Sequence, residues 1–242
     1  MPDQSIFFGK DVLLTRPRAD SERLAELLAA RGMTAHIAPV LDIVPVSEPL
    51  PPLDDYHGLI FTSAHAARLV SAPPAQADKP VFCVGDHCAA TAAESGWRVV
   101  HNARGDGRTL ESLVRERCAG REMRLFHLSG ADISHNFGDT GCRIDRHIIY
   151  RAVPAGSLPE ETLRGLDEGR FFAALFFSAR TARIFAELTD FYGRTSCLQA
   201  INALCLGDKV LESVQQSDWR NVQVAQHPDV PSMIDSLISL YR

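Results

Sequence analysis

The 242-residue sequence lacks the features that mark several classes of protein. Its six cysteines include no CxxC pair and no grouping with histidine at the spacing of zinc ligands. It has no apolar run long enough to cross a bilayer, and residues 1–10 do not have the pattern of a signal peptide. We therefore expect a cytoplasmic protein that has no membrane contact and whose reduced cysteines pack as small hydrophobes.

A surplus of basic residues is also absent. The formal net charge is −5, whereas binding to nucleic acid needs a basic surplus on some face, so nucleic acid is not an expected partner. A small anionic ligand needs only a locally positive cleft and is not excluded. Hydrophobic residues make up 45% and charged residues 23% of the chain, which is typical of a folded globular protein, and the length suits two domains.

Motifs for nucleotide, metal and serine-hydrolase chemistry are missing. The segment GDG at 105–107 begins like a dinucleotide fingerprint but lacks the third glycine, and there is no GxxxxGK[ST], HExxH or GxSxG. The nine histidines form no i, i+4 pair, and His65, His87 and His127 fit ordinary loop or core positions. No cofactor and no metal site is therefore expected.

Short apolar strands alternate with helical patterns along the chain. DVLLTRP at 11–17 predicts a strand, and the leucine spacing predicts a helix over 21–31 that ends at Gly32. Buried runs of this kind, separated by helices, are typical of parallel sheets covered on both faces, so the predicted fold class is α/β. Further strands are expected at 33–40, 58–62, 81–84, 124–128, 146–152, 173–177 and 203–206.

Several motifs occur twice in the same order. LIFTSAHAAR at 59–68 matches LFFSARTAR at 175–183, and VFCVGD at 81–86 matches ALCLGD at 203–208. A tryptophan follows each second motif at the same distance, and an LESL or IDSL segment lies in an amphipathic helix beyond it. The N-terminal strand–helix–strand has a looser counterpart at 124–152. We interpret the chain as two copies of one α/β unit.

Two irregular segments separate the copies. Residues 41–55 are rich in proline and acidic residues, and residues 152–158 are interrupted by proline and glycine. These segments are the expected crossings between domains. A duplicated protein of this kind is expected to hold its ligand in the cleft between its halves.

The repeated strands end in small polar residues at helix starts. Thr62 and Ser63 follow one strand and Ser178 follows its counterpart; a hydroxyl there can cap the helix, whose free N–H groups bind anions. Gly85 and Gly207, after the next strands, allow the backbone to approach a ligand closely. Plain capping and turn geometry are the alternative at each position, but several strand ends that share one edge favour a ligand site.

Basic side chains follow the same strand ends. Arg16, Arg180 and Lys209 lie at strand-to-helix turns. Arginine suits a carboxylate through its planar, two-pronged donor geometry. We therefore expect these three residues to contact an anionic ligand, whereas Arg68 and Arg183, farther along their helices, are expected on solvated faces.

Four segments occur in the order found in uroporphyrinogen-III synthases: LIFTSAHAAR (59–68), VGDHCAATA (84–92), RHIIYRAV (146–153) and FFSARTAR (176–183). The opening VLLTRPRADSERLAELLAARG (12–32) also resembles the N-terminus of that family. The resemblance covers nearly the whole chain. Its specificity lies in the set of segments and their order, because no single motif is specific.

The resemblance implies an α/β fold of two similar domains with parallel sheets, joined by a two-stranded linker and separated by a cleft. It implies that domain 1 takes residues 1–40 and 156–242, that the linker strands lie at 41–55 and 147–155, and that domain 2 is 56–146. It also implies hydroxymethylbilane, a linear tetrapyrrole with acetate and propionate arms, as the small-molecule substrate, with no cofactor.

In the family's reaction, hydroxymethylbilane loses its terminal hydroxyl, ring D is inverted through a spiro intermediate, and the ring closes. The departing hydroxyl needs a proton donor, and Tyr150 matches the family's tyrosine; a strand aromatic in the linker is the alternative. Together with the strand-end candidates, the expected substrate contacts are Arg16, Thr62, Ser63, Ala64, Gly85, Cys88, Ser129, Gly130, Ser178, Ala179, Arg180, Gly207 and Lys209.

This chain departs from the family's pattern at three places. Cys88 stands where threonine is common, Lys209-Val210 where a polar pair is common, and Ser129-Gly130 where many relatives have Arg-Gly. These changes motivate a second hypothesis, a tetrapyrrole-binding or regulatory homologue without turnover. A third is a periplasmic-type small-ligand receptor, which the missing signal peptide opposes. We expect a monomer, and a transient contact with the enzyme that makes the substrate stays open.

Overall fold

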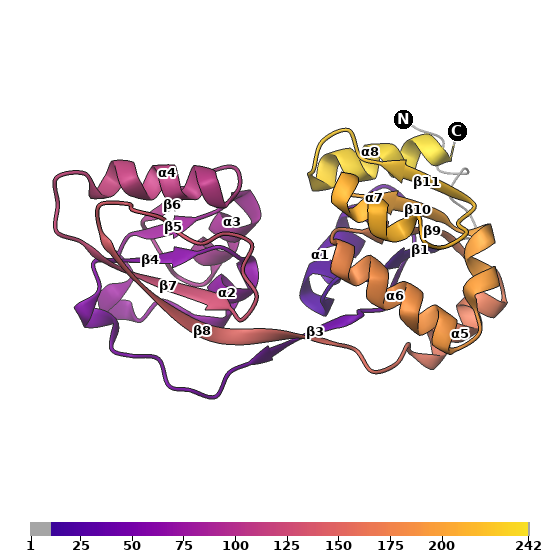
Figure 1. Cartoon of the computed structure of the whole chain (residues 1–242), viewed down its shortest axis with the longest axis horizontal. Coiled ribbons are helices and arrows are strands. Elements are labelled where there is room, and N and C mark those ends of the chain that lie inside the picture. Colours follow the sequence, from indigo (N-terminus) through magenta and orange to yellow (C-terminus); the bar gives the residue numbers. More distant parts are fainter. Residues whose placement is uncertain (1–10, 242) are drawn as a thin grey trace. The chain divides into compact units, whose positions relative to one another are not determined.

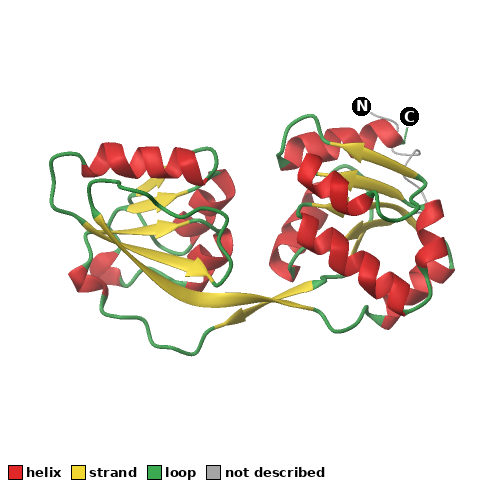
Figure 2. Ribbon diagram, viewed as in Figure 1, coloured by secondary structure: helices red, strands yellow, loops and turns green. Residues whose placement is uncertain are grey.

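The computed structural model describes residues 11–241 (Figure 1). These residues form two compact units: unit 1 consists of 11–42 and 153–241, and unit 2 consists of 43–152. Unit 1 is therefore built from two separate segments of the chain, whereas unit 2 is one continuous segment. Figure 2 shows that each unit is a sheet with helices packed against it.

Unit 1 contains a five-stranded sheet of β1 (Asp11–Leu14), β2 (Ala35–Ile37), β9 (Phe171–Phe176), β10 (Asn202–Cys205) and β11 (Asn221–Val224). The strand order is β11-β10-β9-β1-β2, and every neighbouring pair is parallel. The central strands β1, β9 and β10 consist almost entirely of buried residues, because helices cover both of their faces.

The helices of unit 1 are α1 (Arg18–Ala29), α5 (Glu160–Asp167), α6 (Ala179–Phe191), α7 (Asp208–Val214) and α8 (Val230–Leu240), with a 3-10 helix at Thr195–Ala200. On one face of the sheet, Leu28 of α1 and Leu237 of α8 pack in the same apolar cluster as Leu175 of β9. On the other face, the rings of Phe176 and Phe185 pack with their centroids 5.8 Å apart. The sheet of unit 1 thus lies between two layers of helices.

Unit 2 contains most of a six-stranded sheet of β3 (Leu41–Pro45), β4 (Gly58–Phe61), β5 (Val81–Cys83), β6 (Val100–Asn102), β7 (Arg124–Gly130) and β8 (Arg143–Pro154). The strand order is β3-β8-β7-β4-β5-β6, and the pairs from β8 to β6 are all parallel. The chain passes from one unit to the other within β3 and again within β8.

The helices of unit 2 are α2 (Ala64–Leu69), α3 (Asp86–Glu94) and α4 (Gly107–Cys118), with 3-10 helices at Leu53–Asp55 and Pro74–Gln76. On one face of the sheet, Phe61 and Phe126 pack with Ala67 of α2 and Ala92 of α3. On the other face, the apolar cluster around Ile60, Phe82 and Leu125 includes Leu110, Val114 and Cys118 of α4.

The two sheets share one strand order. The sequence β2-β1-β9-β10-β11 in unit 1 corresponds to β8-β7-β4-β5-β6 in unit 2. This is the order of a doubly wound α/β sheet, which reverses once, between β1 and β9 in unit 1 and between β7 and β4 in unit 2. The shared order supports the internal repeat, and the parallel pairing confirms the predicted α/β class.

One half of the predicted repeat needs correction. In unit 1, α1 joins β1 to β2, but in unit 2 the segment 131–142 between β7 and β8 contains no helix. Phe137 of this segment packs in the apolar cluster beside α4, and the His135 imidazole lies 2.7 Å from the Glu111 carboxylate of α4. In unit 2 a loop therefore covers sheet surface on the face where unit 1 has a helix.

Some predicted element bounds were also wrong. The first strand ends at Leu14 rather than 17, and α1 begins at Arg18, directly after the proline that can start a helix but cannot continue a strand ladder. Of the predicted linker strand 41–55, only Leu41–Pro45 is a strand. The strands β6 and β11 were not predicted, because their residues are partly exposed and form no apolar run.

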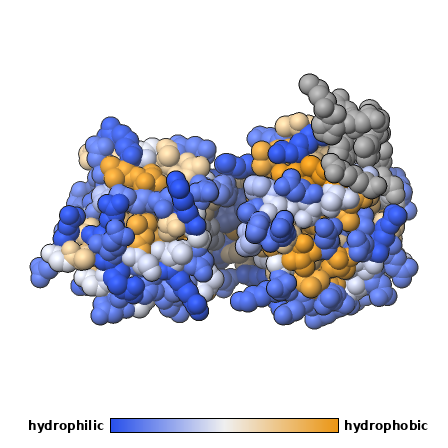
Figure 3. Space-filling model, turned by 90° about the horizontal axis from the view of Figure 1, so that it is seen from above, coloured by the Kyte–Doolittle hydropathy of each residue, from blue (hydrophilic) through white to orange (hydrophobic). Residues whose placement is uncertain are grey.

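The surface of the described chain is mostly polar. Figure 3 shows charged and polar residues over most of the surface in view, with apolar residues in patches on each unit. Phe191, at the end of α6, is 78% exposed, more than any other large hydrophobic residue described. No helix within residues 11–241 is both long enough and apolar enough to span a membrane.

Candidate functional site

The predicted site residues gather at the carboxyl ends of the strands. Sheets of this order bind ligands at that edge, where the strand order reverses. The unit 1 edge consists of Arg16, Ser178, Ala179, Arg180, Gly207 and Lys209, and the unit 2 edge consists of Thr62, Ser63, Ala64, Gly85, Cys88, Ser129, Gly130 and Tyr150. Each of these residues lies at a strand end, in the turn after a strand, in the first turn of the following helix or, for Tyr150, on the neighbouring strand.

In the unit 2 edge, the turn after β4 starts a helix as predicted. Ser63 is the N-cap of α2, and its Oγ accepts a hydrogen bond from the His65 backbone N–H at 3.1 Å. Ala64 is the first helical residue and is buried. Ser63 therefore makes the capping bond that the sequence predicted, and its hydroxyl proton stays available to donate to an acceptor.

Thr62 contacts a buried histidine. Its Oγ1 lies 3.1 Å from Nε2 of His127, a β7 residue that is 2% exposed. Burial lowers the pKa of the His127 imidazole to about 4, and the positive charge of Arg146 on β8 acts in the same direction, so the imidazole is neutral at pH 7. Sequence reasoning treated His127 as an ordinary histidine, because no local pattern links it to Thr62, 65 positions away.

Tyr150 lies on β8 opposite Gly130 of β7, at an irregularity in the register that follows Ser129. The ring packs so closely on Gly130 that a Cβ there would lie 2.6 Å from Tyr150 Cζ. The His65 ring approaches edge-on, with the two centroids 5.8 Å apart. Tyr150 is 8% exposed. Gly130 is thus required by the ring beside it, and His65 is a neighbour of Tyr150 that sequence reasoning missed.

Arg146 holds the end of β7. Its Nε donates to Ser129 Oγ, and its terminal nitrogen donates to the carbonyl oxygens of Gly130 and Ala131, all at 2.8 Å. Ser129 is fully buried, and its hydroxyl donates to the Gly130 carbonyl at 3.1 Å. In this structure the Ser129 side chain therefore serves the strand end. Arg146 was not predicted, since it lies 17 positions from Ser129 on another strand.

Gly85 and Cys88 lie at the start of α3. Gly85 is the N-cap, with an extended backbone, and a Cβ there would meet only the Gly105 carbonyl oxygen at 3.8 Å. Packing within the protein does not require glycine at this position. Cys88 is 3% exposed, and its thiol donates to the Phe61 carbonyl at 3.3 Å, a bond that the threonine hydroxyl common in the family could also make. A hydrogen bond with Cys88 and burial both raise the pKa of the Cys83 thiol.

In the unit 1 edge, Ser178 caps α6. Its Oγ accepts a hydrogen bond from the Thr181 backbone N–H at 3.1 Å and lies 3.0 Å from Thr181 Oγ1. The Thr181 hydroxyl also contacts the Ser178 carbonyl at 2.9 Å. Ala179 is the first residue of α6. The capping role predicted for Ser178 is confirmed, and Thr181 is a second hydroxyl at this helix start.

Arg16 lies where the strand order of unit 1 reverses. Its terminal nitrogen lies 2.7 Å from the Asp20 carboxylate, which is 6% exposed, and its guanidinium stacks over the Phe177 ring at 4.4 Å from the centroid. The Arg16 carbonyl accepts a hydrogen bond from the Ser21 hydroxyl at 2.9 Å. Arg16 therefore links the end of β1, the start of α1 and the end of β9, with its charge already balanced by Asp20.

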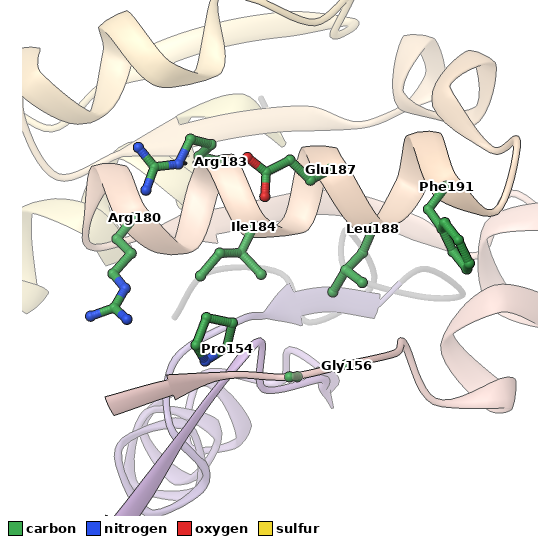
Figure 4. A pocket seen from close by; sticks show the side chains of 9 residues that line it. Pro154, Gly156, Arg180, Arg183, Ile184, Glu187, Leu188 and Phe191 are labelled. Carbon is green, nitrogen blue, oxygen red and sulfur yellow. Dashed lines mark ion pairs between the residues drawn. The ribbon is translucent and has the colours of Figure 1, made fainter. Parts of the chain in front are cut away.

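Arg180 lines a groove of about 680 Å³ along α6 (Figure 4). Arg183, expected on a solvated face, lines the same groove and lies 3.7 Å from the Glu187 carboxylate. Figure 4 shows Arg180 and Arg183 near one end of the helix and Phe191 at the other. The remaining lining residues are Pro154, Ala155, Gly156, Ile184 and Leu188. The groove is thus lined by two guanidinium groups, the Glu187 carboxylate and several apolar side chains.

Gly207 and Lys209 lie at the start of α7. Gly207 is the N-cap with an extended backbone, and a Cβ there would meet no atom within 4 Å. Lys209 is exposed and has no hydrogen bond or ion pair within residues 11–241. Val210, which departs from the family's polar residue, is 6% exposed and packs inward. The unit 1 edge therefore has open backbone at Gly207 beside an unpaired cation.

Metal ligands do not gather in the described residues. Within 11–241, no group of three or more His, Cys, Asp or Glu side chains is placed to hold a metal ion. All six cysteines are free thiols. The GDG segment serves the fold, since Asp106 caps α4 by accepting hydrogen bonds from the backbone N–H groups of Arg108 and Thr109, each at 3.0 Å. The groups that the two edges offer for chemistry are hydroxyls, backbone N–H groups, arginines, a lysine and a tyrosine.

A sequence model of the family described as "Uroporphyrinogen-III synthase HemD" matches residues 22–235, which is most of the chain. The chain belongs to this family. The match includes every predicted site residue except Arg16. It agrees with the resemblance that the ordered segments of the sequence indicated.

Individual relatives are more distant. The chain is 23% identical to the porphyrin biosynthesis protein HemD of Ruminiclostridium josui, covering 96% of this chain and 49% of that protein, so it spans about half the length of this curated relative. A solved uroporphyrinogen III synthase of Thermus thermophilus is 17% identical with a TM-score of 0.42, covering 96% and 100% of the two chains. A mutant form of the Thermus enzyme is 18% identical with a TM-score of 0.48, covering 96% and 98%.

The low pKa of His127 predicts a pH-dependent stability. Its folded-state pKa, about 4, lies below the ordinary value of 6.5, so the unfolded chain binds more protons between these values. His127 should therefore make its full contribution to the free energy of unfolding above pH 6.5. This contribution should fall by about 3 kcal/mol as the pH drops to 4. Urea denaturation of the wild type and of His127→Gln at pH 7, 5 and 4 measures how much of the pH dependence of stability comes from His127. Equal pH dependence in the two proteins would contradict it.

Proposed function

We propose that this protein is a uroporphyrinogen-III synthase, which converts hydroxymethylbilane into uroporphyrinogen III and water. The observation that supports it best is the family match over residues 22–235, which includes Tyr150 and every residue of the two edges except Arg16. The chemistry of those groups agrees with the proposal. They offer donors for carboxylates rather than ligands for a metal or a nucleotide.

The substrate's acetate and propionate arms need hydrogen-bond donors and positive charge. In the unit 1 edge, Lys209 and Arg180 offer charge, and the free N–H groups at the starts of α6 and α7 offer backbone donors. In the unit 2 edge, Thr62 and Ser63 follow β4 and offer hydroxyls, and α3 begins after the neighbouring strand β5. We assign Arg16 to holding the strand ends, because Asp20 already neutralises its charge.

The proposed reaction begins when the terminal hydroxyl of hydroxymethylbilane takes a proton and leaves as water. The electrons of that carbon–oxygen bond leave with the oxygen, and a cationic azafulvene remains. A substituted carbon of ring D attacks this cation to form a spiro intermediate, which rearranges so that ring D is inverted. Closure then releases one proton, so substrate equals product plus water. The protein's part is to supply the proton and hold the chain of rings in the reactive geometry.

Tyr150 is the proposed proton donor. It is held from both sides, by the backbone of Gly130 and by the edge of the His65 ring. A side chain fixed in this way has few orientations to lose when substrate binds. Its place in the apolar core of unit 2 also gives the ring a structural role. The acid role and the packing role are compatible, because packing fixes the ring while the hydroxyl reacts.

A non-catalytic tetrapyrrole-binding homologue is the alternative. This alternative rested on three departures from the family's pattern, and the structure explains two of them by local contacts and burial. The Cys88 thiol donates to the Phe61 carbonyl, and Val210 is buried. These substitutions therefore leave the proposed donors in place, which favours the enzyme.

The decisive experiment generates hydroxymethylbilane in place, oxidises the products and separates type I from type III porphyrins by chromatography. We expect type III in excess of a control without the protein. Type I alone is the spontaneous product, and it would contradict the proposed synthase. Binding of uroporphyrinogen III without any turnover would then favour the non-catalytic homologue.

We predict that Tyr150→Phe lowers kcat about 100-fold, the usual contribution of a positioned general acid, and changes KM less than threefold. Tyr56→Phe is a matched control. Tyr56 is also a buried tyrosine in the core of unit 2, but its hydroxyl donates to Asp145 at 3.3 Å. An unchanged kcat for Tyr150→Phe would leave catalysis to substrate positioning alone.

We also predict that Gly207→Asn keeps the fold but weakens substrate binding. Asparagine is a good N-cap, and the added side chain meets no protein atom at Cβ, so the free energy of unfolding should change by less than about 1 kcal/mol. The side chain would occupy space beside the exposed backbone, and KM should rise about tenfold, a loss of about 1.4 kcal/mol in binding. Gln215→Asn, at the other end of α7, is the control. A KM equal to that control would remove Gly207 from the site.

A further inference from the structure

We propose that His127 is a positioning residue for the substrate: its Nε2–H donates to Thr62 Oγ1 and thereby directs the Thr62 hydroxyl proton toward a carboxylate arm. This inference rests on the proposed function, which supplies the carboxylate-bearing ligand. It concerns a residue of the sheet interior that the ordered segments of the family do not include.

The location of His127 is unusual for a polar side chain. It lies near the middle of β7, opposite Ile60 of β4 and Arg146 of β8, and is 2% exposed. The Phe137 ring packs against its imidazole at 84°, with the centroids 5.2 Å apart. An imidazole buried among such residues loses its hydration, which destabilises the fold unless a hydrogen bond compensates. An apolar side chain would fill the same place without that cost.

The compensating hydrogen bond runs to the candidate site. Thr62 follows the last residue of β4, at the point where the strand order of unit 2 reverses. Its Oγ1 is 3.1 Å from His127 Nε2, a normal hydrogen-bond length. Among the hydrogen bonds of residues 11–241, the one to the Thr62 hydroxyl links His127 to the ligand edge, as expected of a positioning residue.

The direction of this bond follows from the ligand. An ionised carboxylate can only accept hydrogen bonds, so a hydroxyl that binds it must donate its proton. Thr62 has one proton, and when it points to the ligand the oxygen can only accept from His127. Nε2 must then carry hydrogen. The bond His127 Nε2–H to Thr62 Oγ1 polarises the hydroxyl and fixes its rotation before substrate arrives.

The charge state of His127 agrees with this role. Burial first, and the Arg146 guanidinium second, lower its pKa to about 4. The imidazole is therefore a neutral donor at pH 7 and cannot itself supply the proton for the departing hydroxyl. His135 packs on the same Phe137 ring, with the centroids 5.6 Å apart, and its Nε2 lies 2.7 Å from the Glu111 carboxylate. The neutral form restricts His127 to orienting Thr62.

A double-mutant cycle tests the proposal on the full chain. Thr62→Val removes the hydroxyl at constant shape, and His127→Leu removes the donor while keeping the core filled. We expect each to raise KM about tenfold with kcat within about twofold, and the double variant to be no worse than either single one. His127→Gln, which can still donate to Thr62, should recover most of the loss. Losses that add in the double variant would overturn the proposal.

A control variant and a binding measurement that does not depend on turnover complete the double-mutant cycle. His101→Gln is the control, because His101 lies on β6 of the same unit and stacks on Phe82 away from Thr62; its KM should not change. The cycle is also read by anaerobic calorimetric titration with uroporphyrinogen III, so that coupling is measured even if the wild type makes no type III product. A wild type that makes no type III product would contradict the proposed function. The titration would still measure the coupling between His127 and Thr62 in binding.

Nitrogen-15 NMR of histidine-labelled wild type tests the tautomer without any substitution. We expect His127 to carry its hydrogen on Nε2 at pH 7, with a shift in that signal in Thr62→Val. Hydrogen on Nδ1 would overturn the proposal, because Nε2 would then accept the Thr62 proton and turn it away from the ligand. This measurement remains informative if His127→Leu fails to fold.

Discussion

Parallel hydrogen bonding between strands is the constraint on which the rest of this structure depends. In both sheets, every neighbouring pair of strands except the pair with the flanking strand β3 is parallel. The parallel strands of each sheet therefore all end at the same edge. At that edge the ladder stops, and its last residues and the first turns of the helices keep donors that no strand partner satisfies. Hydroxyls, guanidinium groups and backbone N–H groups are thereby gathered from distant parts of the chain.

At these edges, stability and binding use the same residues in different ways. Ser63 and Ser178 cap helices through their oxygens. The Ser63 proton is left for a ligand, whereas the Ser178 hydroxyl also lies 3.0 Å from Thr181 Oγ1. The glycines divide into two kinds. Gly130 leaves room for the ring of Tyr150, whereas a side chain at Gly207 would enter open space. The fold alone explains the first, whereas packing within residues 11–241 does not require glycine at the second.

The sequence was sufficient for the α/β class, for most of the buried strands and for the serine caps of α2 and α6, because short apolar runs and capping residues are local signals. It did not give all strand bounds, and it missed β6 and β11, whose residues are partly exposed. It was insufficient wherever a contact joins different strands. The bonds from His127 to Thr62 and from Arg146 to Ser129 depend on register, which no local pattern reports. The repeated tryptophans also differ in environment, since Trp97 is 1% exposed in the core of unit 2 whereas Trp219 is partly exposed. Matching motifs predicted matching topology but not matching packing.

The division of unit 1 into two chain segments has a consequence for biosynthesis. β1 pairs with β9, and the Thr15 hydroxyl donates to the Leu175 carbonyl, 160 positions later. β1 emerges from the ribosome long before β9 is made. The β1–β2 pair that can form in the meantime is too small to be stable by itself. Unit 2, a continuous segment, has all of its central strands available earlier. Newly made chains should therefore pass through a state in which unit 2 is folded while the apolar strand β1 is still unpaired with β9. Chaperones would need to bind this state to prevent aggregation through β1.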